Sequence, residues 1–237
     1  MDKNIHSRVA ALDWPSLDES LWKHGYALTD PLLTREECQS LIELYPHDEN
    51  FRSHIVMARY RFGSGDYKYF DYPLPPLVRD LREHSYPHLA EIANEWNLAM
   101  ETAVKFPLKH DEFLRQCHKA GQHRATPLLL HYEAGDYNCL HQDLYGDVAF
   151  PLQITIFLSD PSEDYTGGEF VLVEQQLRAQ SRAEVVVPAR GQAVIFATRY
   201  RPVKGSRGFY RTNLRHGVSR VKSGRRFTLG VIYHDAQ

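Results

Sequence analysis

Cysteine is scarce in this sequence, and long apolar runs are absent. The 237 residues include three cysteines, Cys38, Cys117 and Cys139, which are far apart and form no CxxC pair. Such a set argues against a disulfide framework and fits a reducing compartment. No segment approaches the ~20 apolar residues of a membrane-spanning helix, and the N-terminus lacks the apolar stretch of a signal peptide. We therefore expect a cytoplasmic protein with no membrane segment.

The sequence also lacks an excess of charge of either sign. With 28 Lys or Arg and 30 Asp or Glu residues, its formal net charge is -2, so the overall field selects no particular partner. Hydrophobic residues make up 43% and aromatic residues 12%, which is typical of a compact globular protein and not of a disordered chain. This composition supports one sizeable core.

The first half of the sequence has a helical pattern. At residues 16–19 and 34–37, Ser or Thr is followed three residues later by Glu, the capping-box pattern that begins a helix. Apolar residues recur at three- and four-residue steps over residues 77–100, where Pro87 should end or kink the helix. A further helix is expected over residues 111–121, between an Asp N-cap and a Gly stop.

The second half has short β-branched or aromatic runs separated by turn signals. The runs are residues 128–132, 150–158, 169–173, 184–187, 193–197, 213–218 and 226–233. Many short strands at regular spacing favour a sandwich or barrel over a parallel sheet. We expect one domain over residues 1–237, mainly β with N-terminal helices (α+β). Residues 1–124 would form mostly helical support and a lid region, and residues 125–237 the β core.

Two candidate metal ligands lie close together in the sequence. His141 and Asp143 are two residues apart, so at a strand end both side chains point to the same side. A third ligand must come from elsewhere, and His216 stands near the start of a late strand. Two histidines and one carboxylate on one face of an ion leave three coordination positions open. Because the chain has 13 histidines, an HxD triplet alone is weak evidence for a ligand pair.

Further signals surround this triplet in a fixed order. They are Tyr132-Glu-Ala-Gly135 before it, then Gly167-Gly168-Glu169, Arg190-Gly191-Gln-Ala-Val-Ile-Phe196 and the segment from His216 to Leu229. With these signals, residues 132–233 resemble the double-stranded β-helix core of the 2-oxoglutarate- and iron(II)-dependent oxygenases, in the arrangement of the prolyl 4-hydroxylase-like members. The resemblance implies a jelly-roll core buttressed by helices.

The resemblance also implies a function and its cofactors. The protein is expected to be a non-haem iron dioxygenase that uses Fe(II), 2-oxoglutarate and O2. It would hydroxylate a substrate C–H bond with release of succinate and CO2. Its catalytic metal ligands are then His141, Asp143 and His216, and Arg226 binds the distal carboxylate of the cosubstrate. Asp143 disfavours the halogenating variant, in which a small residue stands at this position.

The strand expected over residues 226–233 agrees with that role for Arg226. Arg226 and Thr228 lie side by side on one strand face, where they could clamp a carboxylate. The alternative is an arginine that extends to solvent at a strand end, as expected for Arg225. Tyr132 either lines the cosubstrate pocket or is a core tyrosine with its hydroxyl at the surface.

One position departs from the family pattern. Where many relatives have a tyrosine, this chain has Phe157, which cannot donate a hydrogen bond. If the cosubstrate has a second polar contact, that contact must come from Gln153, Thr155 or Tyr132. The departure concerns the detail of cosubstrate binding and not the class of enzyme.

Basic residues are concentrated near the third candidate ligand. Residues 199–226 contain ten Lys or Arg residues and no acidic residue, and a second basic and aromatic patch covers residues 59–70. The candidate substrate contacts are Arg207, Tyr210, Arg211 and Arg215. Cations that neutralise phosphates and rings that stack on bases suit a nucleic-acid surface. The alternative is a solvated loop whose charges balance the acidic remainder.

The substrate class stays open. The whole-chain pattern is similar to a bacterial group proposed to act on damaged or alkylated nucleobases, related to the AlkB-type demethylases, which implies oxidative demethylation of nucleobases. The spacing from the HxD triplet to Arg226 resembles the prolyl hydroxylases more, so a protein side chain is an alternative substrate, and a small molecule is a third. A different class of function is a non-catalytic jelly-roll binding module with a structural metal, although such sites usually saturate the metal with protein ligands. The sequence carries no signal for an oligomeric state.

Overall fold

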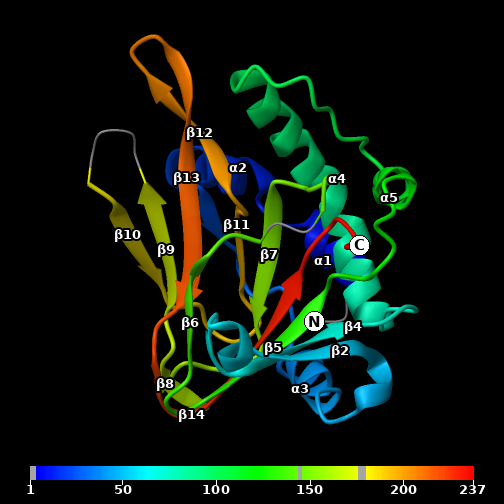
Figure 1. The fold of residues 1–237 in the computed structure, drawn as a ribbon, viewed down its shortest axis with the longest axis vertical. Coiled ribbons are helices and arrows are strands. Elements are labelled where there is room, and N and C mark those ends of the chain that lie inside the picture. The colour runs from blue at the N-terminus through cyan, green and yellow to red at the C-terminus, as the bar shows by residue number, and fades with distance from the viewer. Residues whose placement is uncertain (1–3, 144–145, 176–179) are drawn as a thin grey trace.

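A computed structural model describes residues 4–143, 146–175 and 180–237. Two antiparallel sheets dominate this part of the chain (Figure 1). The larger sheet runs β1 (Tyr26–Leu28), β11 (Ala193–Ala197), β7 (Leu152–Phe157), β14 (Val221–Val231), β5 (Leu128–Glu133), β4 (Asp66–Phe70), β2 (Phe51–Val56), and β8 (Tyr165–Gly167) also pairs with β14. The smaller sheet runs β10 (Arg182–Val186), β9 (Phe170–Gln175), β13 (Gly208–Val218), β6 (Tyr137–His141), β3 (Gly63–Ser64), with β12 (Tyr200–Gly205) paired to β13. The prediction of a mainly β protein is confirmed.

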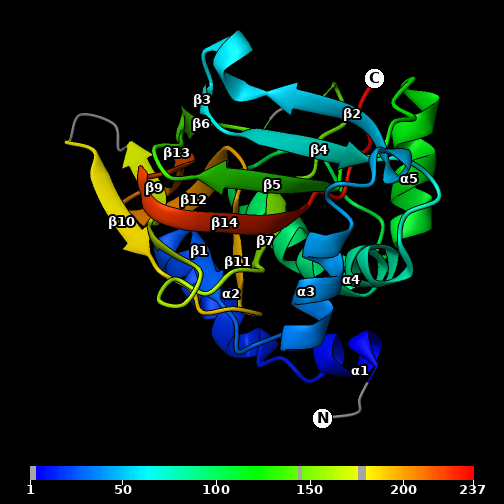
Figure 2. The same cartoon turned by 90° about the horizontal axis from the view of Figure 1, so that it is seen from below.

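Helices cover the face of the larger sheet that is turned away from the smaller one (Figure 2). They are α1 (Ile5–Ala10), α2 (Trp14–His24), α3 (Arg35–Glu43), α4 (Pro76–Ala99) and α5 (His110–Lys119). The short 3-10 helices η1 (Asp48–Asn50) and η2 (Met57–Tyr60) lie at the two ends of β2. Side chains alternate along a strand, so Leu229 and Val231 of β14 join the main hydrophobic core. Thr228 and Gly230 point the other way and line a cavity. The larger sheet therefore separates the core from the functional side.

The capping patterns predict the start of one helix correctly and the starts of two others incorrectly. Thr34 and Glu37 form the expected capping box at the start of α3. The prediction at residue 16 is wrong, because α2 begins two residues earlier. Asp13 is its N-cap, and the Asp13 carboxylate accepts a hydrogen bond from the Ser16 amide at 3.2 Å. Helix α5 likewise begins at His110 with Lys109 as N-cap, and not after an N-cap at Asp111.

The expected break at Pro87 is also wrong, since α4 runs through it from Pro76 to Ala99. An internal proline removes one helical hydrogen bond and costs about 3 kcal/mol. Tyr86 and Leu89, on either side of Pro87, are fully buried in the main core. Tertiary packing of this face offsets the local cost.

Sheet pairing crosses the expected boundary at residue 124. β1 pairs with β11, and β4 pairs with β5, so strands from the first half extend the sheet of the second half. Residues 1–124 thus contribute strands as well as helices. The division into a helical support and a β core at residue 124 stays a prediction. Among the residues described, no helix has both the length and the apolarity needed to cross a membrane.

Candidate functional site

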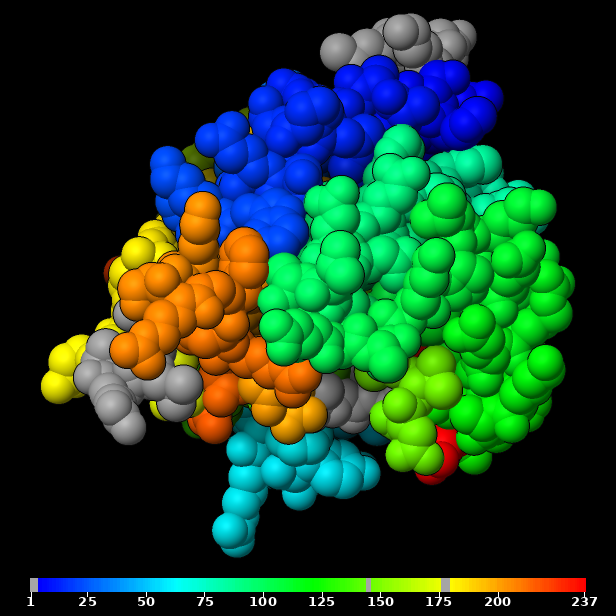
Figure 3. Space-filling model, turned by 90° about the horizontal axis from the view of Figure 1, so that it is seen from above, coloured from blue at the N-terminus to red at the C-terminus, as the bar shows by residue number. Residues whose placement is uncertain are grey.

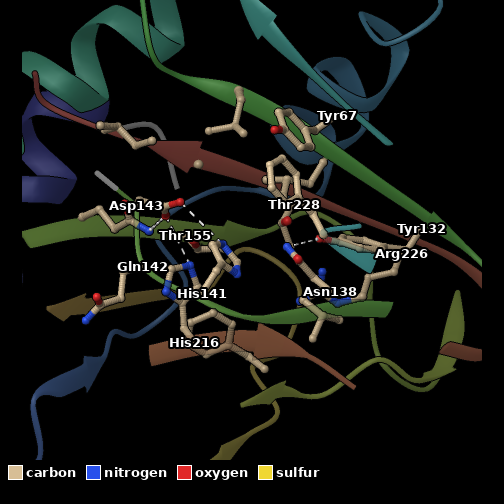
Figure 4. A pocket seen from close by; sticks show the side chains of 18 residues that line it. Tyr67, Tyr132, Asn138, His141, Gln142, Asp143, Thr155, His216, Arg226 and Thr228 are labelled. Atoms are coloured by element: carbon tan, nitrogen blue, oxygen red, sulfur yellow. Dashed lines mark hydrogen bonds and ion pairs between the residues drawn. The ribbon is translucent and has the colours of Figure 1, made fainter. Parts of the chain in front are cut away.

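The three candidate metal-ligand side chains converge at the end of the smaller sheet (Figure 4). His141 ends β6, Asp143 follows two residues later, and His216 of β13 lies directly opposite His141 in the strand register. The Nε2 atom of His216 is 3.2 Å from Asp143 Oδ2, and that of His141 is 3.5 Å from Asp143 Oδ1. Each residue offers one ligand atom, and these atoms all lie within 4.8 Å of one another. One ion could contact all three.

The surroundings of the imidazoles suit metal binding. The Nδ1 atom of His141 is 2.7 Å from the Cys139 carbonyl oxygen. Donation from Nδ1 to this carbonyl leaves Nε2 with a free lone pair that points to the cluster. The His216 ring packs against Phe196 and Phe170, with ring centroids 4.7 Å and 5.9 Å away. Both rings are thus held in place by the sheet.

The surroundings of Asp143 and His216 favour the charge states that bind a metal. For His141, burial is outweighed by the hydrogen bond and charge of Asp143, which raise its pKa. Burial by itself would raise the pKa of Asp143, but His216 and His141 hold that pKa well below its usual value. Burial lowers the pKa of His216, and the neighbouring His141 adds to this effect. Gln153 donates a hydrogen bond of 2.6 Å to Asp143 Oδ2 and orients the carboxylate. An ionised aspartate and a neutral imidazole are the forms that coordinate a divalent ion.

A cavity of about 280 Å³ opens beside the three ligands and lies between the two sheets. Arg226 of β14 stands in its wall and is 1% exposed. Its guanidinium carbon lies 5.3 Å from the ring centroid of Tyr132, 5.0 Å from that of Phe157 and 5.9 Å from that of Tyr165. The charge is therefore buried among aromatic rings, as Figure 4 shows for Tyr132.

Arg226 has no anion beside it in the part of the chain that the structure describes. None of its three guanidinium nitrogens makes a hydrogen bond of acceptable geometry there. The Tyr165 phenol lies close enough for Arg226 to oppose the rise in its pKa that burial causes. A buried, unpaired cation is costly. A carboxylate bound in the cavity would pair with it.

The other predicted cosubstrate residues also line this cavity. Thr228 is 1% exposed and stands next to Arg226 on the same face of β14, and Tyr132 is fully buried. Gln153 and Thr155 reach the cavity from β7. The sequence had left a second polar contact open among Gln153, Thr155 and Tyr132, and all three side chains are placed to supply it.

Asn138 is a cavity residue that the sequence did not reveal. Its side-chain amide donates a hydrogen bond of 3.3 Å to the Tyr132 hydroxyl. Strict alternation along β6 would point Asn138 away from the side of His141. The register contains an irregularity, because His141 lies opposite His216 while Asn138 lies opposite Val218. The extra residue in β6 is a β-bulge, and it brings both side chains to one face.

The far part of the cavity is apolar, which was not expected from the sequence either. Leu128, Ile232, Tyr67 and Phe62 contribute to its lining. Phe62 follows the helix η2 and is 47% exposed, so it stands where the cavity meets solvent. The cavity thus has a cationic end at Arg226 and an apolar part.

The four candidate substrate contacts lie outside this lining. Arg207, Tyr210, Arg211 and Arg215 belong to the hairpin of β12 and β13, which projects from the molecule in Figure 1. A strand was predicted only over residues 213–218, whereas β12 and β13 pair from Tyr200–Asn213 to Gly205–Gly208. The role of the four residues as substrate contacts stays a prediction.

Two cations of the basic segments are structural. Arg201 is 3% exposed and pairs with Glu174, itself 3% exposed, at 2.5 Å. Lys68 of the second basic patch is 6% exposed and pairs with Asp48 at 2.6 Å. Neither cation is available to a phosphate. The prediction that residues 201 and 68 belong to basic surfaces is therefore wrong.

Known proteins resemble this chain along most of its length. Residues 65–236 match the family model Oxygenase-NA, which is described as an oxygenase catalysing oxidative methylation of damaged DNA. An uncharacterized protein of Mycobacterium tuberculosis is 41% identical over 215 residues, which is 91% of each chain.

The solved structures that resemble it share the fold at low sequence identity. A prolyl-4-hydroxylase of Pseudomonas putida has a TM-score of 0.55 at 13% identity and covers 94% of this chain and 100% of its own. The α-ketoglutarate-dependent epimerase SnoN from nogalamycin biosynthesis has a TM-score of 0.57 at 14% identity, over 94% of this chain and 82% of its own. A 2OG-Fe(II) oxygenase family protein of Burkholderia pseudomallei has a TM-score of 0.52 at 12% identity, over 100% and 95%. The chain therefore belongs to the Oxygenase-NA family of oxygenases and has the jelly-roll fold of the iron(II)- and 2-oxoglutarate-dependent enzymes.

Proposed function

We propose that this oxygenase hydroxylates an alkyl group on a base of nucleic acid, with Fe(II) bound by His141, Asp143 and His216 and 2-oxoglutarate bound at Arg226. The observation that carries the proposal is the unpaired guanidinium of Arg226, 1% exposed, in the same cavity as the three candidate ligands. The donor set supports iron(II), since two histidines and one carboxylate are the facial triad of non-haem iron oxygenases. The nucleic-acid substrate is supported by the description of the family.

The side chains of the site have separate tasks in this proposal. Bound iron with the keto acid supplies the oxidising power that a C–H bond requires. Arg226 pairs with the distal carboxylate through parallel hydrogen bonds, and Thr228 donates its hydroxyl to the same group. Gln153 keeps Asp143 oriented toward the metal position. The rings around Arg226 exclude water and strengthen its attraction for the carboxylate.

The reaction balances for a methylated base. The base, 2-oxoglutarate and O2 give a hydroxymethylated base, succinate and CO2. The C–N bond of a hydroxymethyl group on nitrogen then breaks, the group leaves as formaldehyde, and the hydroxyl proton is transferred to the nitrogen. This chemistry removes methyl groups from damaged bases.

The other classes of function have less support. Prolyl hydroxylation rests on a fold shared at 13% identity with a prolyl-4-hydroxylase, and a fold does not determine a substrate. A non-catalytic binding module does not explain why a buried arginine without an anion faces the three ligands. The three cysteines, none of which forms a disulfide, support a reducing compartment such as the cytoplasm.

The decisive experiment measures succinate formation from 2-oxoglutarate under air with added Fe(II). The substrates compared are a single-stranded oligonucleotide with N-methylated bases, the unmethylated oligonucleotide, and a proline-rich peptide. We expect succinate and formaldehyde in equal amounts with the methylated oligonucleotide alone, and no iron-dependent activity in His216→Ala. His123→Ala, at an exposed histidine outside the cavity, is the matched control. Turnover with the peptide and not with the oligonucleotide would assign the enzyme to protein hydroxylation.

A further inference from the structure

The η2 turn, which comprises the helix η2 and the next two residues (57–62), presents two aromatic rings to solvent beside the cavity. Tyr60 is 56% exposed and Phe62 is 47% exposed, and their rings stack with centroids 5.6 Å apart at an angle of 18°. Phe62 is also part of the cavity lining. The stack therefore continues from the cavity to the molecular surface. An exposed aromatic pair that is continuous with a cavity and rimmed by polar residues is a candidate binding surface.

The turn is held firmly at its base. Met57 is fully buried and packs in a cluster with Tyr132 and Val218. The Phe62 carbonyl accepts a hydrogen bond of 2.8 Å from the Cys139 amide, and Gly63 pairs with Asn138 of β6. The turn thus rests on the strand that carries His141. Its exposed rings have a fixed position relative to the candidate metal ligands.

Arginines flank the two rings. Arg59 and Arg61 are exposed, and neither makes an ion pair within the described ranges. Arg61 has a left-handed backbone conformation, with φ of 60°, which reverses the chain between the two rings. Two unpaired cations beside a pair of stacked rings are complementary to phosphates and bases.

A second cationic element, the β12–β13 hairpin, also adjoins the cavity. Figure 3 shows the segment around η2 (cyan) projecting at the lower edge and the β12–β13 hairpin (orange) above it on the left, facing the viewer. Gln142, which lines the cavity, donates hydrogen bonds to the Arg199 and Leu214 carbonyls at the base of this hairpin. The cavity is therefore flanked by both elements.

We propose that the η2 turn is the base-stacking site for single-stranded nucleic acid: an unpaired base stacks on Tyr60 and Phe62, and Arg59 and Arg61 bind the phosphates on either side. This site would hold the strand so that an adjacent base enters the cavity past Phe62. The inference rests on the proposed function, because it assumes a nucleic-acid substrate. A peptide on the same surface is an outcome that the test below excludes or reveals.

The test measures binding of a fluorescein-labelled 12-nucleotide oligothymidine to the full chain by anisotropy, over a series of KCl concentrations. Tyr60→Leu and Phe62→Leu should each weaken binding roughly 5- to 150-fold, the effect of losing one stacked base, with the same salt dependence as the parent. Arg59→Gln with Arg61→Gln should lower the slope of log K against log salt by about 1.4. The control variant Arg79→Gln with Arg115→Gln removes two exposed cations from α4 and α5, and it should retain the parental slope. Thermal unfolding of each variant reports its fold.

The outcomes separate this inference from the proposed function. If the parent binds the oligonucleotide and the aromatic variants bind equally well, the stacking site is wrong, and the proposed function stands as long as methylated oligonucleotide is still oxidised. If the parent does not bind at low salt, the stacking site is also wrong, and oxidation of a free methylated nucleoside then decides the proposed function. Binding of a fluorescein-labelled proline-rich peptide to the parent, without oligonucleotide binding, would assign the surface to a protein partner.

Discussion

At the scale of single residues, the environment of Arg226 is the feature with the clearest consequence. The residue is 1% exposed among three aromatic rings and has no anionic partner within the described chain. Folding must desolvate this cation without recovering the energy in an ion pair. Such a site is destabilising until a carboxylate binds, so affinity for the cosubstrate and stability of the free protein should be linked.

Arg226→Met tests that link. We expect the cosubstrate-free variant to unfold at a higher temperature than the parent, because the unpaired charge is gone. Its affinity for 2-oxoglutarate should fall by about 3–5 kcal/mol, the typical cost of leaving a buried charge unpaired. Thermal unfolding and calorimetric titration with 2-oxoglutarate measure the two effects. The control is Arg225→Met, at an exposed neighbour. Unchanged 2-oxoglutarate affinity in Arg226→Met would move the carboxylate site elsewhere.

At the scale of secondary-structure elements, Asp66 joins four segments. It lies on β4 and accepts hydrogen bonds from Tyr45 after α3, from His54 of β2 and from His131 of β5. Burial by itself would raise the pKa of Asp66, but the hydrogen bonds from His131, Tyr45 and His54 lower it to about 2. The ionised carboxylate therefore stabilises this edge of the larger sheet.

The pH dependence of that contribution has a definite sign. Because the folded pKa of about 2 lies below the ordinary value of 3.8, the stabilisation is complete above about pH 4 and is lost as the pH falls toward 2. We expect Asp66→Asn to cost about 2 kcal/mol at pH 7 and progressively less below pH 4. Urea unfolding at pH 7, 4 and 3 measures the difference, with Asp111→Asn on the surface as control. If the difference in unfolding free energy between the parent and Asp66→Asn stayed constant down to pH 3, the stabilisation would not come from the ionised Asp66 carboxylate.

The β12–β13 hairpin depends on a buried ion pair. Arg201 bonds Glu174 of β9 at 2.5 Å and donates to the Trp22 carbonyl of α2 at 2.9 Å. Glu174→Leu leaves the Arg201 charge buried, and we expect a loss of about 3–5 kcal/mol in the free energy of unfolding. The double variant Glu174→Leu with Arg201→Met should recover most of this loss, because no charge is then left unpaired. Equal unfolding free energies for the single and double variants would show that the pair carries no such penalty.

At the scale of the whole molecule, a net charge of -2 conceals an uneven distribution. The exposed cations Arg207, Arg211 and Arg215 form no ion pair with any described residue and lie on one hairpin. Local fields of this kind act on a charged partner even when the total charge does not. The hairpin is therefore where electrostatic attraction for a phosphate backbone should be found.

The corresponding prediction concerns salt dependence. Replacing Arg207, Arg211 and Arg215 with Gln should weaken binding of single-stranded oligonucleotides of any sequence. It should also lower the slope of log K against log salt by about 2. A variant with three Gln substitutions at Arg79, Lys105 and Arg115, all exposed, controls for total charge. If both triple variants bind like the parent, the hairpin is a solvated element and not a nucleic-acid surface.

The local sequence was sufficient to predict which residues share a strand face and which side chains are candidate ligands. The period of two along β14 correctly separates Leu229 and Val231, in the core, from Thr228, in the cavity wall. The two-residue spacing of His141 and Asp143, together with His216, identifies the three side chains that the structure brings within 4.8 Å. These inferences succeed because strand geometry is set by neighbouring residues.

Only the tertiary structure decided the features that depend on register and packing. The β-bulge that brings Asn138 to the side of His141 arises from the pairing of β6 with β13. The continuation of α4 through Pro87 depends on a core built from distant segments, and the placement of Phe62 depends on the contact of η2 with β6. Contacts between residues far apart in the chain carry no signature in the local sequence, and their energies exceed local preferences of a few kcal/mol.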